Sequence, residues 1–303
     1  MKKAYLAAFF AIVFWGTTFA VGKLVTPVPL NSISFTMIRT IFGGLVLLLY
    51  LGVTHQIQAW IEILKRYRWQ LLCLGAFGFT LSYILQYWAL SMTTATNQSI
   101  ISNTQTFWVV ILNFIVFHRK PKAIFVIGAI LAFIGVILVI FNGELGVTPV
   151  TLKGDLLSIL TFFSWGAYTT FTKPLSMKEK SIFITSGIIF WAMIFVIPFG
   201  VLSNAFVEMQ LLTAAEWGIM LYLGVVCVAG SFILWNYALS DKNVHSENIA
   251  LFTLLNPVVG IFFAVILLGE VITWQIIGGI ILIIVGLIIA QHSPNSNSTA
   301  SPH

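Results

Sequence analysis

The chain has 303 residues, of which 59% are hydrophobic and 8% are charged, and its mean hydropathy is +1.01. A water-soluble protein of this size needs far more charge on its surface, so this composition excludes a soluble globular domain and predicts an integral membrane protein. The net charge of +6 does not indicate nucleic-acid binding, because the basic residues lie in short loops and form no basic stripe beside aromatic residues.

Apolar segments follow one another along the whole chain, each close to the length of about 20 residues that crosses a bilayer as a helix. The first is kept as a helix because no small-residue cleavage site of a signal peptide follows it. The polar end of the chain, 292–303, is predicted to be disordered. We therefore predict an all-α membrane protein with ten transmembrane helices, at 4–24, 32–52, 70–90, 96–117, 123–141, 154–174, 182–202, 217–239, 249–268 and 272–290.

The basic residues alternate between loops and so predict the orientation of the chain. If the N-terminus is cytoplasmic, the outer side has only Lys153, with Lys23 near the outer end of the first helix. The alternation favours an even number of spans, a location in the plasma (inner) membrane and cytoplasmic N- and C-termini. The basic residues assigned to the cytoplasmic side are Lys2, Lys3, Lys65, Arg66, Arg68, Arg119, Lys120, Lys122, Lys173, Lys178, Lys180 and Lys242.

The two halves of the chain repeat one pattern. Residues 15–23 and 165–173 both begin with Trp-Gly, pass through Thr and end in Lys, at equivalent places in the two halves. Five helices per copy is an odd number, so the two copies must lie in the membrane in opposite orientations, an inverted repeat typical of alternating-access carriers. We expect one repeat at 1–145 and the other at 150–291. Further pairs that match are Leu74-Gly75 with Leu223-Gly224, Ala89-Leu90 with Ala238-Leu239, and Gly128 with Gly278.

The duplicated five-helix unit that opens with Trp-Gly, together with Asn256-Pro257 and Gly269-Glu270, resembles the EamA type of the drug/metabolite transporter superfamily. The resemblance covers residues 5–290. It implies export or exchange of small metabolites, often amino acids, through a cavity lined by helices 1, 3, 4, 6, 8 and 9. The first half departs from the second, with Thr106-Phe107 and Arg119-Lys120 at the matching places, so symmetry alone assigns no roles there.

The chain carries no catalytic pattern. It has no paired acids within one helix, no Ser-His-Asp spacing and no Gly-rich phosphate loop after a strand. The five histidines fall in loops, helix ends or the tail, and Cys73 and Cys227 lie in apolar runs, where packing as buried thiols is expected. We predict no enzyme activity, no cofactor and no metal.

Polar residues inside apolar helices are the best pointers to a transport site, because they are costly in lipid. Arg39, a third of the way into its helix, is either an anchor for a substrate carboxylate or a structural residue that binds helix-end carbonyls or snorkels to the outer interface. The stripes Gln98, Ser102, Gln105 and Ser158, Thr161, Thr169, Thr172 either line a wet cavity or join helices by hydrogen bonds.

Aromatic residues add a second signal. Trp60, Trp69, Trp217 and Trp274 lie at helix boundaries and are expected at the membrane interface. Deeper rings are expected to form a pocket for substrate. The predicted substrate-binding residues are Trp15, Thr18, Arg39, Tyr83, Gln86, Tyr87, Gln98, Ser102, Gln105, Trp165, Tyr168, Trp235, Asn236 and Asn256.

Acidic residues are missing from the centre of every predicted span. This favours facilitated diffusion or exchange, with Glu247 as the alternative if a proton is coupled. The prediction is a carrier for small metabolites, with amino acids or related compounds as cargo. Its partners are the substrate and the lipid bilayer. Alternatives are a drug or nucleoside-type transporter and, more remotely, a membrane sensor or accessory protein. Both a monomer and a homodimer remain open.

Overall fold

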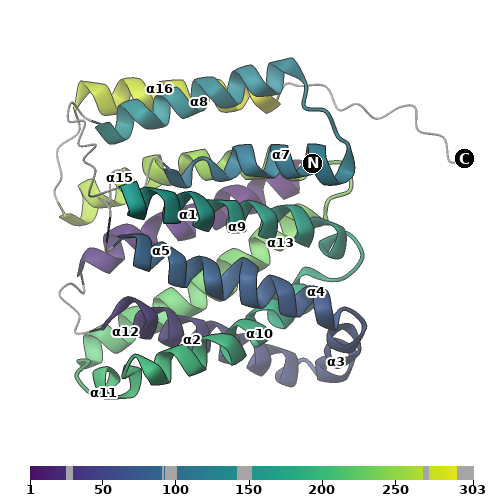
Figure 1. The fold of residues 1–303 in the computed structure, drawn as a ribbon, viewed down its shortest axis with the longest axis vertical. Helices are drawn as coiled ribbons and strands as arrows, with labels where there is room; N and C mark the ends of the chain where they lie inside the picture. The colour runs from purple at the N-terminus through teal and green to yellow at the C-terminus, as the bar shows by residue number, and fades with distance from the viewer. Residues whose placement is uncertain (25–29, 91, 93–100, 142–151, 269–272, 292–303) are drawn as a thin grey trace, which may run out of the picture.

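The computed structural model describes residues 1–24, 30–90, 92, 101–141, 152–268 and 273–291. These residues form helices and turns and contain no β-strand. Figure 1 shows the long helices running roughly side by side across the molecule, with α8 and α16 paired at one edge. The predicted all-α class is therefore confirmed.

The first half begins with helices that agree with the predicted spans to within a few residues. One additional helix, α3, lies between the second and third spans, and it has charged residues on one side and Trp60 and Ile63 buried on the other. The helices of this half are α1 (Lys2–Leu24), α2 (Ser32–Val53), α3 (Ile57–Arg66), α4 (Arg68–Cys73), η1 (Leu74–Leu81), α5 (Ser82–Leu90), α7 (Gln105–Phe117) and α8 (Ala123–Phe141).

The second half follows the same order. Its helices are α9 (Leu152–Ser176), α10 (Ser181–Leu202), α11 (Ala205–Met209), α12 (Ala214–Tyr222), η2 (Leu223–Gly230), α13 (Ser231–Ser240), α14 (Ser246–Ala250), η3 (Leu251–Leu255), α15 (Asn256–Leu268) and α16 (Trp274–Gln291).

Two π-helical segments, η1 and η2, interrupt otherwise α-helical rods at equivalent places in the two halves. A serine follows each one, and its hydroxyl donates to a carbonyl inside the π-helical segment. Ser82 reaches Phe77 at 3.2 Å, and Ser231 reaches Val226 at 3.1 Å. In each half, the serine hydroxyl therefore satisfies a backbone carbonyl where the main-chain hydrogen bonds change from π to α spacing. Both halves have the same contact at this point.

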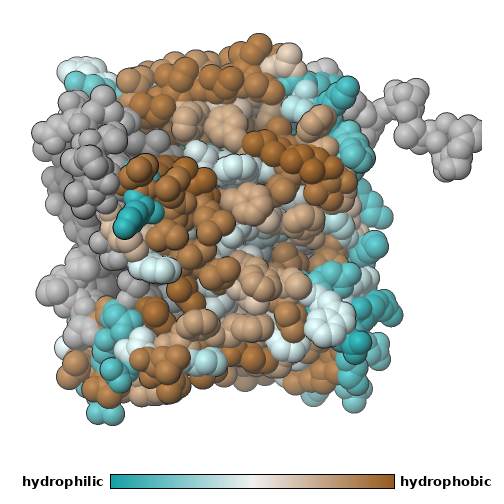
Figure 2. Space-filling model, viewed as in Figure 1, coloured by the Kyte–Doolittle hydropathy of each residue, from teal (hydrophilic) through white to brown (hydrophobic). Residues whose placement is uncertain are grey.

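Apolar side chains cover the outside of the molecule. Five helical stretches among the described residues are long and apolar enough to cross a membrane, namely 33–53, 68–86, 181–202, 214–240 and 246–263. Shorter apolar helices are 105–117, 123–138 and 274–290. Figure 2 shows hydrophobic residues across the middle of one face and hydrophilic residues gathered toward its side edges. Such a surface suits a bilayer core between two aqueous phases.

Helices of one half pack against helices of the other in an exchanged pattern. The first helix, α1, contacts α13 and α15, and its counterpart α9 contacts α5 and α7. The glycines of the Trp-Gly motif permit this. A Cβ on Gly16 would lie 2.7 Å from the Cβ of Val259, and one on Gly166 would lie 2.7 Å from the Cβ of Trp108. These glycines therefore let the two helix pairs approach each other closely.

The α8–α16 pair is also built on glycines. A Cβ on Gly128 would lie 2.6 Å from the Gly286 carbonyl oxygen, and one on Gly135 would lie 2.6 Å from that of Gly279. The site of Gly278 is open instead. The predicted match of Gly128 with Gly278 is thus displaced by one position, because Gly279 and not Gly278 faces the partner helix.

Other expectations differ in detail. Cys227 is buried as expected, but Cys73 is exposed at the end of α4. Trp69 and Trp274 are largely exposed at helix ends, whereas Trp60 is buried against Phe190. Residues 96–100 of the fourth predicted span, Gly269-Glu270 and the tail 292–303 lie outside the described residues.

Candidate functional site

The rings of both halves meet in one central group, which we call the aromatic cluster: Trp15, Phe79, Tyr83, Trp165, Tyr168, Phe232 and Trp235. Phe232 is fully buried and lies at its centre. Its ring centroid is 5.2 Å from that of Trp15, 5.8 Å from Trp165 and 5.0 Å from Phe79. Tilted and edge-to-face rings at these separations attract each other beyond simple burial.

The two motif tryptophans have matching places in the cluster. Trp15 packs on Phe232, and Trp165 packs on Tyr83 with centroids 5.0 Å apart. Tyr83 directly follows the serine at the end of η1, and Phe232 directly follows the serine at the end of η2. Each tryptophan of one half therefore sits on the equivalent ring of the other half. The indole of Trp15 also donates to the Cys227 carbonyl at 3.0 Å. Trp15 and Trp165 thus both contact Phe232, although they come from different halves.

Arg39 brings a positive charge to the edge of the cluster. It is 2% exposed, and its guanidinium carbon lies 4.4 Å from the centre of the Tyr83 ring, a cation–π contact. Its backbone lies at the crossing of α2 and η2, where a Cβ on Gly224 would be 2.8 Å from the Arg39 carbonyl oxygen. The equivalent crossing in the other half has Ile188 against Gly75. The two crossings are therefore equivalent in their packing, but only the one in α2 carries a positive charge.

A buried hydrogen-bond network borders the cluster on the side of Tyr168. The amide nitrogen of Asn236 donates to the hydroxyl of Thr185 at 2.8 Å and lies 3.2 Å from the Tyr168 hydroxyl. All three side chains are buried. The cluster therefore offers apolar ring faces, one cation and a few fixed polar groups, which is the usual composition of a small-molecule site.

The end of the bundle that holds most of the basic residues is tied together by further polar contacts. Lys173, buried although it was counted as a loop charge, donates to the carbonyls of Leu239 at 2.8 Å and Asp241 at 2.6 Å. It thereby binds two carbonyls at the end of α13. Between the halves, Arg119 lies 3.2 Å from His245. Burial is the main cause that lowers the pKa of His245.

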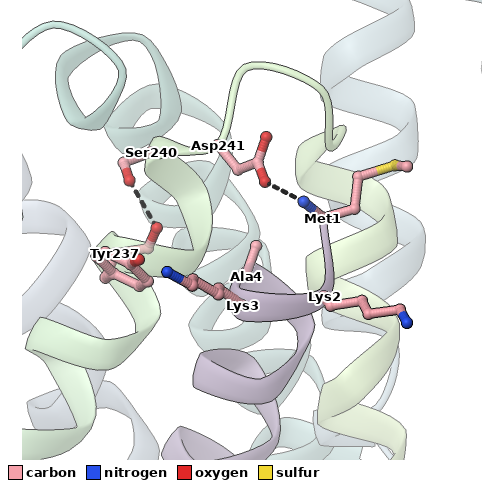
Figure 3. A pocket seen from close by; sticks show the side chains of 7 residues that line it. All are labelled: Met1, Lys2, Lys3, Ala4, Tyr237, Ser240 and Asp241. Atoms are coloured by element: carbon pink, nitrogen blue, oxygen red, sulfur yellow. Dashed lines mark hydrogen bonds and ion pairs between the residues drawn. The ribbon is translucent and has the colours of Figure 1, made fainter.

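A cleft of about 320 Å³ opens at the same end, beside the start of α1. The amino group of Met1 pairs with the Asp241 carboxylate at 2.7 Å, and Ser240 donates to the Tyr237 carbonyl at 2.7 Å (Figure 3). The hydrogen bond from the amino group holds the pKa of Asp241 below its usual value. The cleft is a surface feature of this end and does not include residues of the aromatic cluster.

The structure brings together only part of the predicted site. It joins Trp15, Arg39, Tyr83, Trp165, Tyr168, Trp235 and Asn236. The ring contacts and hydrogen bonds given above do not reach five other candidates, Thr18, Gln86, Ser102, Gln105 and Asn256. Gln98 and the side chain of Tyr87 lie outside what the structure describes.

Sequence reasoning missed three residues of this region, Phe79, Phe232 and Thr185. Phe232 could have been found, because it is the repeat counterpart of Tyr83 and lies three residues before Trp235. Phe79 lies in the apolar run of η1, where no pattern distinguishes it. Thr185 lies in an apolar helix that the sequence had not connected with Asn236.

Comparisons with known proteins place the chain among transporters. A model of the EamA-like transporter family matches residues 2–141 and 152–290, one match in each half. A protein named "Uncharacterized transporter" from Archaeoglobus fulgidus is 32% identical over 194 residues, which cover 64% of this chain and 65% of that protein. A "Probable amino-acid metabolite efflux pump" from Salmonella typhimurium is 29% identical over 199 residues, 63% of this chain and 65% of that protein.

Other matches are longer. "Uncharacterized transporter YetK" from Bacillus subtilis is 26% identical over 270 residues, which cover 88% of this chain and 79% of that protein. By comparison, this chain spans about 65% of the length of the Archaeoglobus and Salmonella proteins named above. A solved crystal structure superposes with a TM-score of 0.81 at 17% identity, covering 96% of both chains, and so shares the fold.

Proposed function

Because the chain belongs to the EamA-like transporter family, we propose that it is a carrier that exports or exchanges a small metabolite, an amino acid or a related compound, by alternating access. In this proposal it crosses the membrane ten times as two inverted five-helix repeats, 1–145 and 150–291. The exchanged packing of α1 and α9 supports the arrangement, since the contacts of Gly16 and Gly166 match in the two halves.

The observation that carries the proposed cargo is the aromatic cluster with Arg39 beside it. Both halves contribute rings to the cluster, which is where the site of an inverted-repeat carrier is expected. A guanidinium can bind a carboxylate through two parallel hydrogen bonds, and the rings can cover an apolar or aromatic side chain. Since the equivalent of Arg39 is Ile188, a zwitterionic cargo would bind in one orientation, with its carboxylate toward α2.

The other cargo classes fit less well. A lipophilic cation would meet the positive charge of Arg39 over Tyr83, where the ring face is already occupied by a cation. A nucleoside-type metabolite could stack on the rings but has no carboxylate for the guanidinium. The name of the Salmonella relative, which refers to amino-acid metabolites, supports the same choice.

Location and coupling are part of the proposal. The basic residues at the end that holds Met1 favour cytoplasmic termini in the plasma membrane. Exchange or facilitated diffusion is favoured over proton coupling, because Glu247 lies at that end, where the amide of Asn113 donates to it at 2.8 Å, and not in the cluster.

Counterflow tests this proposal. Purified protein in liposomes preloaded with an unlabelled amino acid should take up the same labelled amino acid faster than empty liposomes do. The panel should include aromatic, branched and small amino acids, a nucleoside and a lipophilic amine. Counterflow by the nucleoside or the amine alone would replace the proposed cargo, and counterflow by none of the panel would contradict it.

A further inference from the structure

A buried hydrogen-bonded contact joins α7 of the first half to the helix of the second half that begins at Ser246. The hydroxyl of Thr106 donates to the Ala250 carbonyl at 3.0 Å and lies 3.1 Å from the hydroxyl of Thr253. Thr253 donates to the same carbonyl at 2.7 Å. Both threonines are buried. We call Thr106 and Thr253 the inner pair.

The same face of α7 is held again further along the helix. The amide nitrogen of Asn113 donates to Ser246 at 2.8 Å and to Glu247 at 2.8 Å. The spacing from Thr106 to Asn113 is close to two helical turns, so both side chains project from one side of α7. The two contacts therefore hold one half against the other between the cluster and the end with the basic residues.

The helix that begins at Ser246 changes its hydrogen-bonding pattern where the inner pair lies. It changes from α14 to the 3₁₀ segment η3 and then to α15, and Thr253 is in the middle of η3. Pro257 has no N–H, so it cannot bond to the carbonyl of Thr253 one turn before it. A 3₁₀ stretch inside a long helix often marks a hinge. The segment that carries Thr253 can thus turn against α15 with little loss of helical hydrogen bonds.

The repeat supplies a counterpart to the inner pair. The offset between the two Trp-Gly motifs relates Gly16 to Gly166 and also Val259 to Val109. A Cβ on Gly16 would lie 2.7 Å from the Cβ of Val259, and one on Gly166 would lie 3.4 Å from the backbone nitrogen of Val109. Residues that the offset relates in sequence therefore also make related packing contacts in the structure. It places Asn256 at the position equivalent to Thr106, and Asn103 at the position equivalent to Thr253.

In the part of the chain covered by the structure, the side-chain amide of Asn256 has an acceptor without a donor. We call Asn103 and Asn256 the outer pair. The Oδ1 of Asn256 is buried and accepts no hydrogen bond from the residues that the structure describes. A buried acceptor without a donor costs about 1–3 kcal/mol, so native proteins rarely keep one without a use. The inner pair is closed, whereas its counterpart has an acceptor still to be satisfied.

We propose that the outer pair is the closing contact of the opposite transport state. When the inner pair separates, the amides of Asn103 and Asn256 come together and hydrogen-bond, taking the place of the contact that the threonines of the inner pair make at the Ala250 carbonyl in the present arrangement. This inference rests on the proposed alternating access and is independent of the cargo. It gives Asn256 the role of a positioning residue and not that of a substrate ligand.

Disulfide trapping of the two pairs tests the proposal without any substrate. The full-length protein would carry Cys73→Ser and Cys227→Ser, and a mild oxidant would be applied in liposomes. The inner pair variant is T106C with T253C, and the outer pair variant is N103C with N256C. In the present arrangement the inner pair should cross-link faster, because its two oxygens are 3.1 Å apart.

A second substitution should shift the balance. Asn113→Ala removes two contacts of the inner side, so cross-linking of the inner pair should slow and that of the outer pair should accelerate. Loss of a net hydrogen bond corresponds to a change of about fivefold in the ratio of the two rates. Thr54→Ala is the matched control, because Thr54 lies at the same end of the bundle and its hydroxyl donates to the Tyr50 carbonyl in the last turn of α2. It should leave the ratio unchanged.

A single-residue variant covers the case in which the outer cysteines impair folding. Asn256→Ala removes the proposed outer contact, so it should accelerate cross-linking of the inner pair by a similar factor. If Asn256 only supports the local fold or binds cargo, this rate without substrate should stay as it was.

The results separate this inference from the proposed function. Failure of the outer pair to cross-link with Asn113→Ala present, or movement of both rates in the same direction, would overturn the inference. Full counterflow by a protein with its outer pair cross-linked would also overturn it. If the two cross-linking rates change in opposite directions but no amino acid gives counterflow, the proposed role of the outer pair is supported and the proposed cargo is rejected.

Discussion

Replacing Gly16 by alanine should destabilise the protein, although alanine is the better helix former. The new Cβ would lie 2.7 Å from the Cβ of Val259, whereas carbon atoms normally stay about 3.5–4.0 Å apart. The Cβ of Val259 is fixed by its backbone, so a rotamer change cannot relieve the overlap. The helices α1 and α15 must separate by roughly 1 Å.

The magnitude follows from two opposing effects. Overpacking of a well-filled contact costs about 1–3 kcal/mol. Removing a glycine from a helix gains about 1 kcal/mol. The net effect of Gly16→Ala is therefore a loss of up to roughly 2 kcal/mol of unfolding free energy. Gly166→Ala should behave in the same way, because its Cβ would lie 2.7 Å from the Cβ of Trp108.

Gly278→Ala is the matched control. The structure places no described atom within 4 Å of its new Cβ, so only the gain in helix propensity remains. Thermal unfolding of the three variants in detergent, followed by the fraction of monodisperse protein, should give a lower Tm for Gly16→Ala and Gly166→Ala. The Tm of Gly278→Ala should stay equal or rise. A Tm for Gly16→Ala at or above that of Gly278→Ala would refute the reasoning from close packing.

Three other predictions concern transport and charge. Arg39→Lys should reduce counterflow of carboxylated cargo about tenfold at a normal protein level, because an ammonium lacks the planar fork; loss of protein from the membrane would mean a structural role. Trp165→Ala should weaken apparent affinity several-fold through loss of ring contacts, about 1 kcal/mol, while Trp69→Ala, at an exposed ring, should not. Asp241 has a lowered pKa because of the Met1 amino group, so the pair stabilises the protein above the usual pKa of about 4 and is lost as the pH falls further. The difference in Tm between Asp241→Asn and the parent should therefore vanish in acid, and a difference that persists there would contradict this assignment.

The sequence predicted the relation between residues that have a repeat partner. Trp15 and Trp165 were paired by their equivalent places in the two halves, and their contacts with equivalent rings agree with it. Arg39 was singled out because a guanidinium is exceptional in an apolar run, but the sequence did not decide whether it is buried.

The rest depended on packing. Phe79 is buried in the cluster, but Phe77, earlier in the same run, is exposed. Hydropathy assigns the same value to both. Lys173 was counted as a loop charge, since nothing in its own segment reveals that carbonyls at the end of α13 lie within reach. The error at Gly278 has the same origin, because only the facing helix shows which of two adjacent glycines it contacts.

The exchanged packing of α1 and α9 bears on how such a chain could have arisen and how it can be divided. Each half buries its first helix in the other half, so a half produced by itself would leave the faces around Gly16 or Gly166 uncovered. Two separate halves, however, contain every surface that the joined chain uses. In the proposed inverted-repeat arrangement, the fold corresponds to an antiparallel dimer whose two halves are joined in one chain. It should therefore reassemble from two co-expressed fragments cut within 142–151.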